Sequence, residues 1–480
     1  MELQKKLLSG LFWVMLLNLM IKPLWILGIE RGVQNAVGVA EYGLYFTLFN
    51  ISYIFNILLD LGVTNFNTRN IAQSPWLIGK HLSHIFTLKL ALVGLYVIVT
   101  FTIGGIRGFS SREFWLLSFL CLNQFLNSMI LYLRSNFEGL LLFKWDSVLS
   151  VLDRLLMIVI CGALLIGLDR FRVEWFVWAQ TISYGVAFAL AFVVLVRKVG
   201  LKGLNWNKAF SAAVLKKSFP FALLVLLMAS YNRMDPVLLD WLLPDGQYQA
   251  GIYAEAFRLL DALTMIAYLV SVPLLPIYSK LTAKGLNSKD EVGKITKMVL
   301  SMVIVFAVAA AITFSYLSTP LMDLMYFDHV EESAAVFKVL IYGIIPISFT
   351  YIFGTLLTAN GSLRQLNVLA LMALVVNIVV NVVLIPRMAA LGSAWASLIA
   401  QSFMALTQML LALKIFDIWP KFGYMIQLFL YVIVIIVANV LCLHAMAWLA
   451  HLLVLIVVAL AAGFGMRLID AKELKQLIKE

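Results

Sequence analysis

Residues 221–240, FALLVLLMASYNRMDPVLLD, are apolar enough to cross a lipid bilayer, yet they carry three charges. The next apolar segment, 250–277, also carries three. These charged residues are Arg233, Asp235, Asp240, Glu255, Arg258 and Asp261. A charge at the bilayer centre costs about 2.5–3.5 kcal/mol even on insertion scales, and such residues usually face a cavity on a substrate or ion path. The two segments therefore predict a membrane protein that uses buried charges.

The rest of the chain has the same apolar character. Its 480 residues are 63% hydrophobic and 13% charged, with a mean hydropathy of +0.97, whereas soluble domains have about 25% charged residues. The apolar segments are continuous rather than alternating, which indicates helices and not a barrel. We predict an all-α polytopic membrane protein with about fourteen spans, at 9–29, 43–66, 82–104, 113–133, 146–168, 174–196, 218–241, 250–277, 298–317, 334–358, 364–385, 391–413, 421–443 and 447–466.

Basic residues gather in alternate loops, which orients the spans by the positive-inside rule. The loop at 197–217 is the longest and is rich in lysine, and the residues around 280–297 and 467–479 are similar. Both termini are then expected in the cytoplasm. The net charge of +11 comes mostly from this bias and does not indicate nucleic-acid binding.

The basic loop also divides the chain into two predicted lobes. We expect an N-terminal lobe at 1–200, a C-terminal lobe at 201–417, and two extra spans with an amphipathic cytoplasmic tail at 418–480. An internal repeat supports two pseudo-symmetric lobes of six helices each, because three residue pairs match at one offset. These pairs are Gly43 and Gly251, Tyr45 and Tyr253, and Phe49 and Phe257.

Three basic residues are expected at a similar depth in the outer half of the membrane, from helical rise. They are Lys22, Arg233 and Arg258; Arg154 should lie nearer the inner half. Guanidinium and ammonium groups suit a phosphate. The alternative is internal pairing, because Glu255, Arg258 and Asp261 are spaced one turn apart. Asp153 should point away from its neighbour Arg154.

Two prolines are predicted to break spans next to these basic residues. Pro23 follows Lys22, and Pro236 follows Asp235. A proline inside a helix removes one hydrogen bond and clashes with the carbonyl four residues earlier. Broken helices at membrane depth are tolerated where they line a cavity, so we expect hinges here; harmless kinks are the alternative.

Other polar residues within the spans allow two interpretations each. Asp60, near the end of span two, is either an interfacial acid or a gate or proton site. Asn377 and Asn381 lie on one helix face and bond either to other helices or to a ligand. Arg134 and Glu138, one turn apart, are expected to pair.

The sequence has no pattern for catalysis or metal binding. We find no Walker A loop, G-x-S-x-G elbow or HExxH motif, and the three cysteines have no metal or disulfide spacing. We therefore expect no catalytic residues, no cofactor and no metal. Asp60, Asp235, Asp240, Glu255 and Asp261 are candidates for ion coupling or charge pairing.

Several segments together resemble the polysaccharide (Wzx-type) flippases of the MOP exporter superfamily. The resemblance covers nearly the whole chain, and the order of its motifs is more specific than any one of them. The motifs are Glu41 to Tyr45 with Leu59 to Gly62, Tyr231 to Asp235, Ala250 to Tyr253 with Phe257 to Asp261, Pro273 to Pro276, Asn377 to Asn381, Leu384 to Pro386 and Leu391 to Ala394.

The resemblance implies a flippase of the bacterial inner membrane. Its two lobes would form a V around a cationic cavity and, as a monomer, move an undecaprenyl-diphosphate-linked oligosaccharide to the outer leaflet by alternating access. Such oligosaccharides are repeat units of O-antigen lipopolysaccharide, capsule or exopolysaccharide, and polymerases or glycosyltransferases are the expected partners. The candidate cavity contacts are Lys22, Arg154, Arg233, Arg258, Asn377 and Asn381.

Two other functions remain open at this point. A cation-coupled multidrug or small-molecule exporter of the same superfamily would use Asp235, Glu255 and Asp261 as its binding groups. A membrane glycosyltransferase or polymerase is the third alternative, although the short outer loops leave little room for a catalytic domain.

Overall fold

The computed structural model describes most of the chain, and the regular elements among its described residues are all helices. These are 20–21, 23–64, 67–68, 71, 78–140, 142–168, 170–200, 206–271, 274–282, 289–443 and 447–469. Lys22 and the predicted amphipathic tail beyond 469 lie outside them. The described part forms two compact units, Met1–Gly251 and Ile252–Glu480. The predicted lobe boundary near residue 200 stays a prediction.

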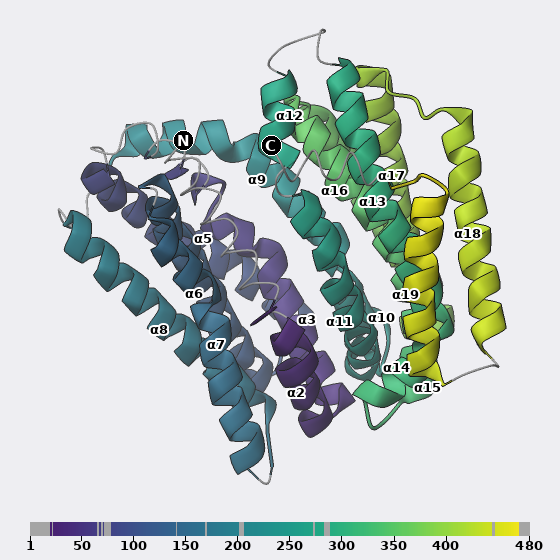
Figure 1. Cartoon of the computed structure of the whole chain (residues 1–480). Coiled ribbons are helices and arrows are strands. Elements are labelled where there is room, and N and C mark those ends of the chain that lie inside the picture. Colours follow the sequence, from purple (N-terminus) through teal and green to yellow (C-terminus); the bar gives the residue numbers. More distant parts are fainter. Residues whose placement is uncertain are drawn as a thin grey trace. The chain divides into compact units, whose positions relative to one another are not determined.

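Unit 1 contains the first seven predicted spans and the start of the eighth. Its elements are the π-helix η1 (Leu24–Glu30), α2 (Arg31–Val37), α3 (Val39–Ile54), the 3-10 helix η2 (Phe55–Leu59), α5 (Ile78–Arg107), α6 (Ser111–Gly139), α7 (Phe143–Gly167), α8 (Val173–Val199), α9 (Lys208–Arg233), α10 (Asp235–Leu242) and the first turns of α11 (Gly246–Ser271). Within it, α8 packs against both α6 and α7, and α3 packs against α6, α9 and α10 (Figure 1).

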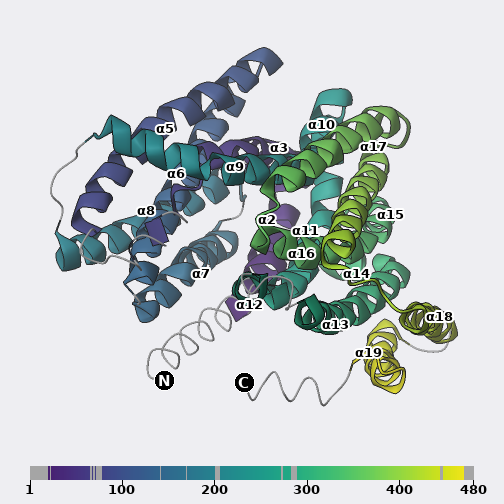
Figure 2. The ribbon, with the colours of Figure 1, turned by 90° about the horizontal axis from the view of Figure 1, so that it is seen from above.

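Unit 2 begins within α11. It continues through α12 (Leu274–Thr282), α13 (Lys289–Tyr316), α14 (Ser318–Met325), α15 (Val330–Leu340), η5 (Ile341–Gly343), α16 (Ile344–Ala359), α17 (Leu363–Phe416), α18 (Phe422–Leu443) and α19 (Trp448–Gly465). The last two helices lie side by side at one edge of the unit and pack on α13 (Figures 1 and 2). Tyr431 anchors them by donating its hydroxyl to the Val305 carbonyl at 3.0 Å.

The helices agree with the predicted polytopic membrane fold. Ten helices of the described residues are long and apolar enough to cross a membrane, or eleven if the bent α9 counts as one span. One of the ten, α17, holds two predicted spans, 364–385 and 391–413, because Ala389 (φ 50°, ψ −131°) breaks that helix three residues after Pro386. Predicted span eight corresponds to the more polar α11, and the first predicted span lies mostly outside the described residues.

An apolar cluster joins several helices of unit 1 at the end opposite the α10–α11 turn. It includes Leu82 and Ile85 of α5, Leu133 of α6 and Val214 of α9, all nearly inaccessible. His84 and Phe210 extend this contact, with ring centroids 5.7 Å apart. The beginning of α9 is therefore fixed to α5 and α6, while its far end carries Arg233.

Candidate functional site

The break in span seven lies beside Arg233. Helix α9 ends at Arg233, α10 begins at Asp235, and Pro236 occupies the first turn of α10, where a missing N–H costs no helical bond. The Arg233 guanidinium lies 5.2 Å from the centre of the Tyr53 ring on α3. Asp235 is fully buried. The break predicted from Pro236 is present, while its role as a hinge stays a prediction.

Helices α3 and α11 approach closely at two glycines from the predicted repeat. A Cβ on Gly43 would collide with the backbone oxygen of Gln247, and one on Gly251 with that of Val39. Four residues along α3, the Thr47 hydroxyl donates to the Pro236 carbonyl at 3.3 Å. We call these contacts the α3–α11 crossing; it has no room for side chains at either glycine.

Ion pairs reinforce the same end of unit 1. Arg107, at the end of α5, donates to the Asp240 carbonyl at 2.7 Å and lies 4.0 Å from its carboxylate. Arg112 of α6 makes two hydrogen bonds to Glu41, at 2.6 and 3.0 Å, and one to Glu174 at 2.9 Å. Asp240 thus forms an ion pair with Arg107, and whether it takes part in ion coupling stays a prediction.

Arg154 lies within unit 1 on α7, close to the first helical region. Its guanidinium is 5.5 Å from the centre of the Trp25 ring. Its Nε lies 3.6 Å from a carboxylate oxygen of Asp153. The expectation that adjacent residues diverge was wrong here, because the long arginine side chain reaches its neighbour.

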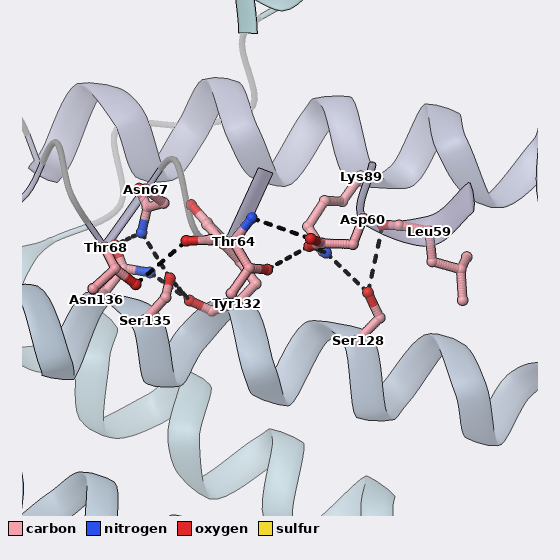
Figure 3. A network of polar contacts seen from close by, with 10 residues as sticks. All are labelled: Leu59, Asp60, Thr64, Asn67, Thr68, Lys89, Ser128, Tyr132, Ser135 and Asn136. Atoms are coloured by element: carbon pink, nitrogen blue, oxygen red, sulfur yellow. Dashed lines mark hydrogen bonds and ion pairs between the residues drawn. The ribbon is translucent and has the colours of Figure 1, made fainter. Parts of the chain in front are cut away.

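Asp60 lies in a network of buried polar groups that the sequence did not reveal (Figure 3). Lys89 of α5 donates to the Asp60 carboxylate at 2.7 Å and to the Ser128 hydroxyl of α6 at 2.9 Å. Both the hydroxyl and the backbone N–H of Thr64 donate to the same carboxylate. Asp60 is therefore an acid within a network, and a role as a gate or proton site stays a prediction.

Lys89 could have been found from the sequence. It is the one Asp, Glu, Lys or Arg in the predicted span 82–104, and charges inside spans are rare and usually paired. Its partner could not have been found, because sequence spacing does not show which face of one helix meets another.

The predicted pair of Arg134 and Glu138 is replaced by other partners. Arg134 Nε donates to Asp146 on α7 at 2.7 Å, and Glu138 accepts from the Thr68 hydroxyl at 3.4 Å. The prediction was wrong because α7 brings a carboxylate that the spacing along α6 alone does not show.

In unit 2, Glu255 of α11 contacts α15 and the residue that follows α14. The Ser333 hydroxyl of α15 donates to the Glu255 carboxylate, and Tyr326 donates to the Glu255 carbonyl at 3.3 Å. Glu255 is 4% exposed and Arg258 7%. Asp261 is half-buried one turn beyond Arg258. Whether Glu255 or Asp261 takes part in ion coupling stays a prediction.

Asn377 and Asn381 are fully buried on one face of α17. The Asn381 amide donates to the Asn377 carbonyl at 2.9 Å, and its oxygen accepts from Ser393 beyond the Ala389 break, also at 2.9 Å. This bond joins the two halves of α17. A role for either asparagine in ligand contact stays a prediction.

Family comparisons agree with this architecture. The model of the family described as polysaccharide biosynthesis protein matches residues 7–282. The model of the family described as lipid II flippase MurJ matches residues 147–462. The comparison with curated proteins found no match.

Solved membrane transporters share the fold. A lipid II flippase MurJ in an inward closed conformation is 13% identical, with 97% of this chain and 100% of that chain covered and a TM-score of 0.66. A mutant of the Vibrio cholerae MATE transporter VcmN is 16% identical, with 87% and 97% covered and a TM-score of 0.55. A MOP superfamily transporter from Pyrococcus furiosus is 13% identical, with 86% and 95% covered and a TM-score of 0.56.

Each family model covers more than half of the chain, and the matched regions overlap from residue 147 to residue 282. The chain belongs to the polysaccharide biosynthesis protein family and to the family described as lipid II flippase MurJ.

Proposed function

We propose that this protein moves an undecaprenyl-diphosphate-linked oligosaccharide from the inner to the outer leaflet of the bacterial inner membrane by alternating access. The oligosaccharide is a repeat unit of O-antigen, capsule or exopolysaccharide. The protein acts as a monomer with both termini in the cytoplasm and supplies a polysaccharide polymerase. It is a transporter and not an enzyme.

The observation that carries this proposal is the position of Arg233. A guanidinium lies within a span, at a helix break, and beside the aromatic ring of Tyr53. Such a group offers several N–H donors to a diphosphate, and an aromatic ring next to it suits the apolar face of a sugar. Arg154, Arg258 and Lys22 are the other proposed cationic contacts, and Asn377 and Asn381 are proposed sugar contacts.

The α3–α11 crossing supports the alternating-access part of the proposal. By the orientation from the basic loops, its glycines lie toward the outer side of the membrane. Two backbones in direct contact there leave no passage between these helices. Outward release of a large headgroup therefore requires the crossing to separate, with Pro236 and Pro23 as hinges.

The test is transport of a lipid-linked oligosaccharide in proteoliposomes. Arg233→Ala should lower the initial rate about tenfold or more, because charge-assisted hydrogen bonds contribute roughly 1.5–3 kcal/mol, while Arg233→Lys should keep part of it. Arg172→Ala, at an exposed loop position, is the matched control. Full transport by Arg233→Ala at a normal protein level would contradict the proposal.

A cation-coupled small-molecule exporter is the second candidate. The shared fold with MATE transporters and the burial of Asp235 and Glu255 favour it. Here the carboxylates, and not the arginines, would bind the cargo or a coupling ion. Dye efflux that is abolished by Asp235→Asn and retained by Arg233→Ala would support this function over the first.

A further inference from the structure

Lys89 and Asp60 meet where span two is broken. Helix α3 tightens into η2 at Phe55, ends at Leu59, and is followed by two residues of positive φ, Leu61 (44°) and Gly62 (79°). A break inside a membrane protein leaves backbone groups that need partners. One of these, the Leu59 carbonyl, accepts a hydrogen bond from Ser128 at 3.4 Å.

Two oxygen atoms bind the Lys89 ammonium. Nζ bonds to Asp60 Oδ1 at 2.7 Å and to Ser128 Oγ at 2.9 Å, and the Thr64 hydroxyl shares the same carboxylate oxygen (Figure 3). Carboxylate, hydroxyl and carbonyl oxygens are the groups that bind hard metal cations. The ammonium therefore occupies the position that a small monovalent cation would take.

The two partners differ in exposure. The Lys89 side chain is 1% exposed and that of Asp60 is 22%. Tyr132 covers the ammonium further, with its ring centre 5.8 Å away. A lysine this deeply buried is held in place by its surroundings, whereas the carboxylate keeps part of its surface exposed.

Stability alone does not explain a buried ion pair. Replacing such a pair by apolar side chains is often neutral or stabilising, whereas removing one partner is strongly destabilising. The break also lies directly against α9, since a Cβ on Gly62 would be 3.0 Å from the Ser218 Cβ. The ion pair that fixes the break therefore also affects the packing of this segment against α9.

We propose that Lys89 is a tethered cation: its ammonium permanently fills an oxygen-lined monovalent-cation site, which holds the break in span two in place. Removal of the side chain converts the position into a site for a free cation of the same charge. This proposal concerns a cation site within the protein and does not depend on the identity of the transported substrate.

The test measures the melting temperature of the purified full-length protein in detergent. In tetramethylammonium chloride, Lys89→Ala should melt roughly 3–5 °C lower than the wild type, because that cation has the charge but is too large for the site. Sodium chloride or propylammonium chloride at the same ionic strength should restore most of the loss. Propylammonium matches the removed side chain.

A double variant separates the effect of charge from that of side-chain packing, and a second lysine serves as a control. Asp60→Asn with Lys89→Met removes both charges, so its melting temperature should lie near that of the wild type and should not respond to the choice of cation. Lys297→Ala is the control, because Lys297 also lies over a tyrosine ring, at 5.6 Å from Tyr424, but is exposed; it should show no cation response.

Two results would overturn the proposal. The first is a Lys89→Ala protein that folds but gains no stability from either small cation, which would show that the site takes no free cation. The second is a double variant that melts as low as Lys89→Ala, which would show that side-chain packing and not charge holds the break. Neither result bears on lipid-linked oligosaccharide transport.

Discussion

The guanidinium of Arg233 lies 5.2 Å from the ring centre of Tyr53, so a charge at the end of α9 contacts α3 at the break in span seven. Both side chains are half-buried. A cation over an aromatic face contributes roughly 0.5–2 kcal/mol, more when water is excluded. This contact links the predicted anion-binding group to a ring on another helix.

Tyr53→Leu should therefore lower the free energy of unfolding by about 1 kcal/mol, whereas Tyr53→Phe should change it little, because the aromatic face is kept. Thermal unfolding of the purified variants measures both. The double variant Arg233→Ala/Tyr53→Leu completes the cycle. Additive losses would show that the two side chains do not interact.

The second prediction concerns the ion pairs of Arg112 with Glu41 and Glu174. All three side chains are partly exposed, between 26% and 46%. Exposed pairs contribute about 0.2–1 kcal/mol and are screened by salt. Arg112→Ala should thus lower the melting temperature slightly at low ionic strength, and the difference should vanish near about 1 M sodium chloride. A large, salt-independent loss would mean that the arginine acts through packing.

The helices and the breaks could be predicted from the sequence because both follow from local chemistry. Apolar length predicts the spans, and Pro236 predicts the end of α9 since its ring excludes a helical bond. The shared face of Asn377 and Asn381 follows from helical spacing alone. These features need no knowledge of which helices are neighbours.

The polar partners could not be predicted, because they come from distant parts of the chain. Lys89 is 29 residues from Asp60, and Ser128 is 39 residues from Lys89. Likewise Arg134 pairs with Asp146 on the next helix and not with Glu138 one turn away. Spacing along one helix identifies residues on the same face, but the identity of the facing helix depends on packing of the whole unit.

The third prediction concerns the bond from Ser393 to Asn381 across the Ala389 break. Both side chains are fully buried. Ser393→Ala leaves the Asn381 oxygen without this donor, which should cost about 1–3 kcal/mol of stability. Ser118→Ala is the matched control, because the Ser118 hydroxyl bonds only to its own helix at an exposed position. Equal melting temperatures for the two variants would show that the bond does not stabilise α17.

The fourth prediction concerns Gly43 in the α3–α11 crossing. Gly43→Ala places a methyl group against the Gln247 backbone, which cannot move as a flexible side chain would. Overpacking of this kind costs about 1–3 kcal/mol. Gly94→Ala is the matched control, because a Cβ there meets nothing within 4 Å, and alanine in an open helical position should add up to about 1 kcal/mol.

The same substitution also tests whether the α3–α11 crossing is closed in the membrane. Thr47 is 1% exposed beside it, so a Thr47→Cys thiol should react slowly with a membrane-impermeant maleimide. Adding Gly43→Ala should force the helices apart and raise that labelling rate, whereas adding Gly94→Ala should leave it unchanged. If Gly43→Ala behaves like Gly94→Ala in both melting temperature and labelling rate, the backbones of α3 and α11 are not in contact in the membrane. The proposal that the α3–α11 crossing closes the outer side would then be wrong.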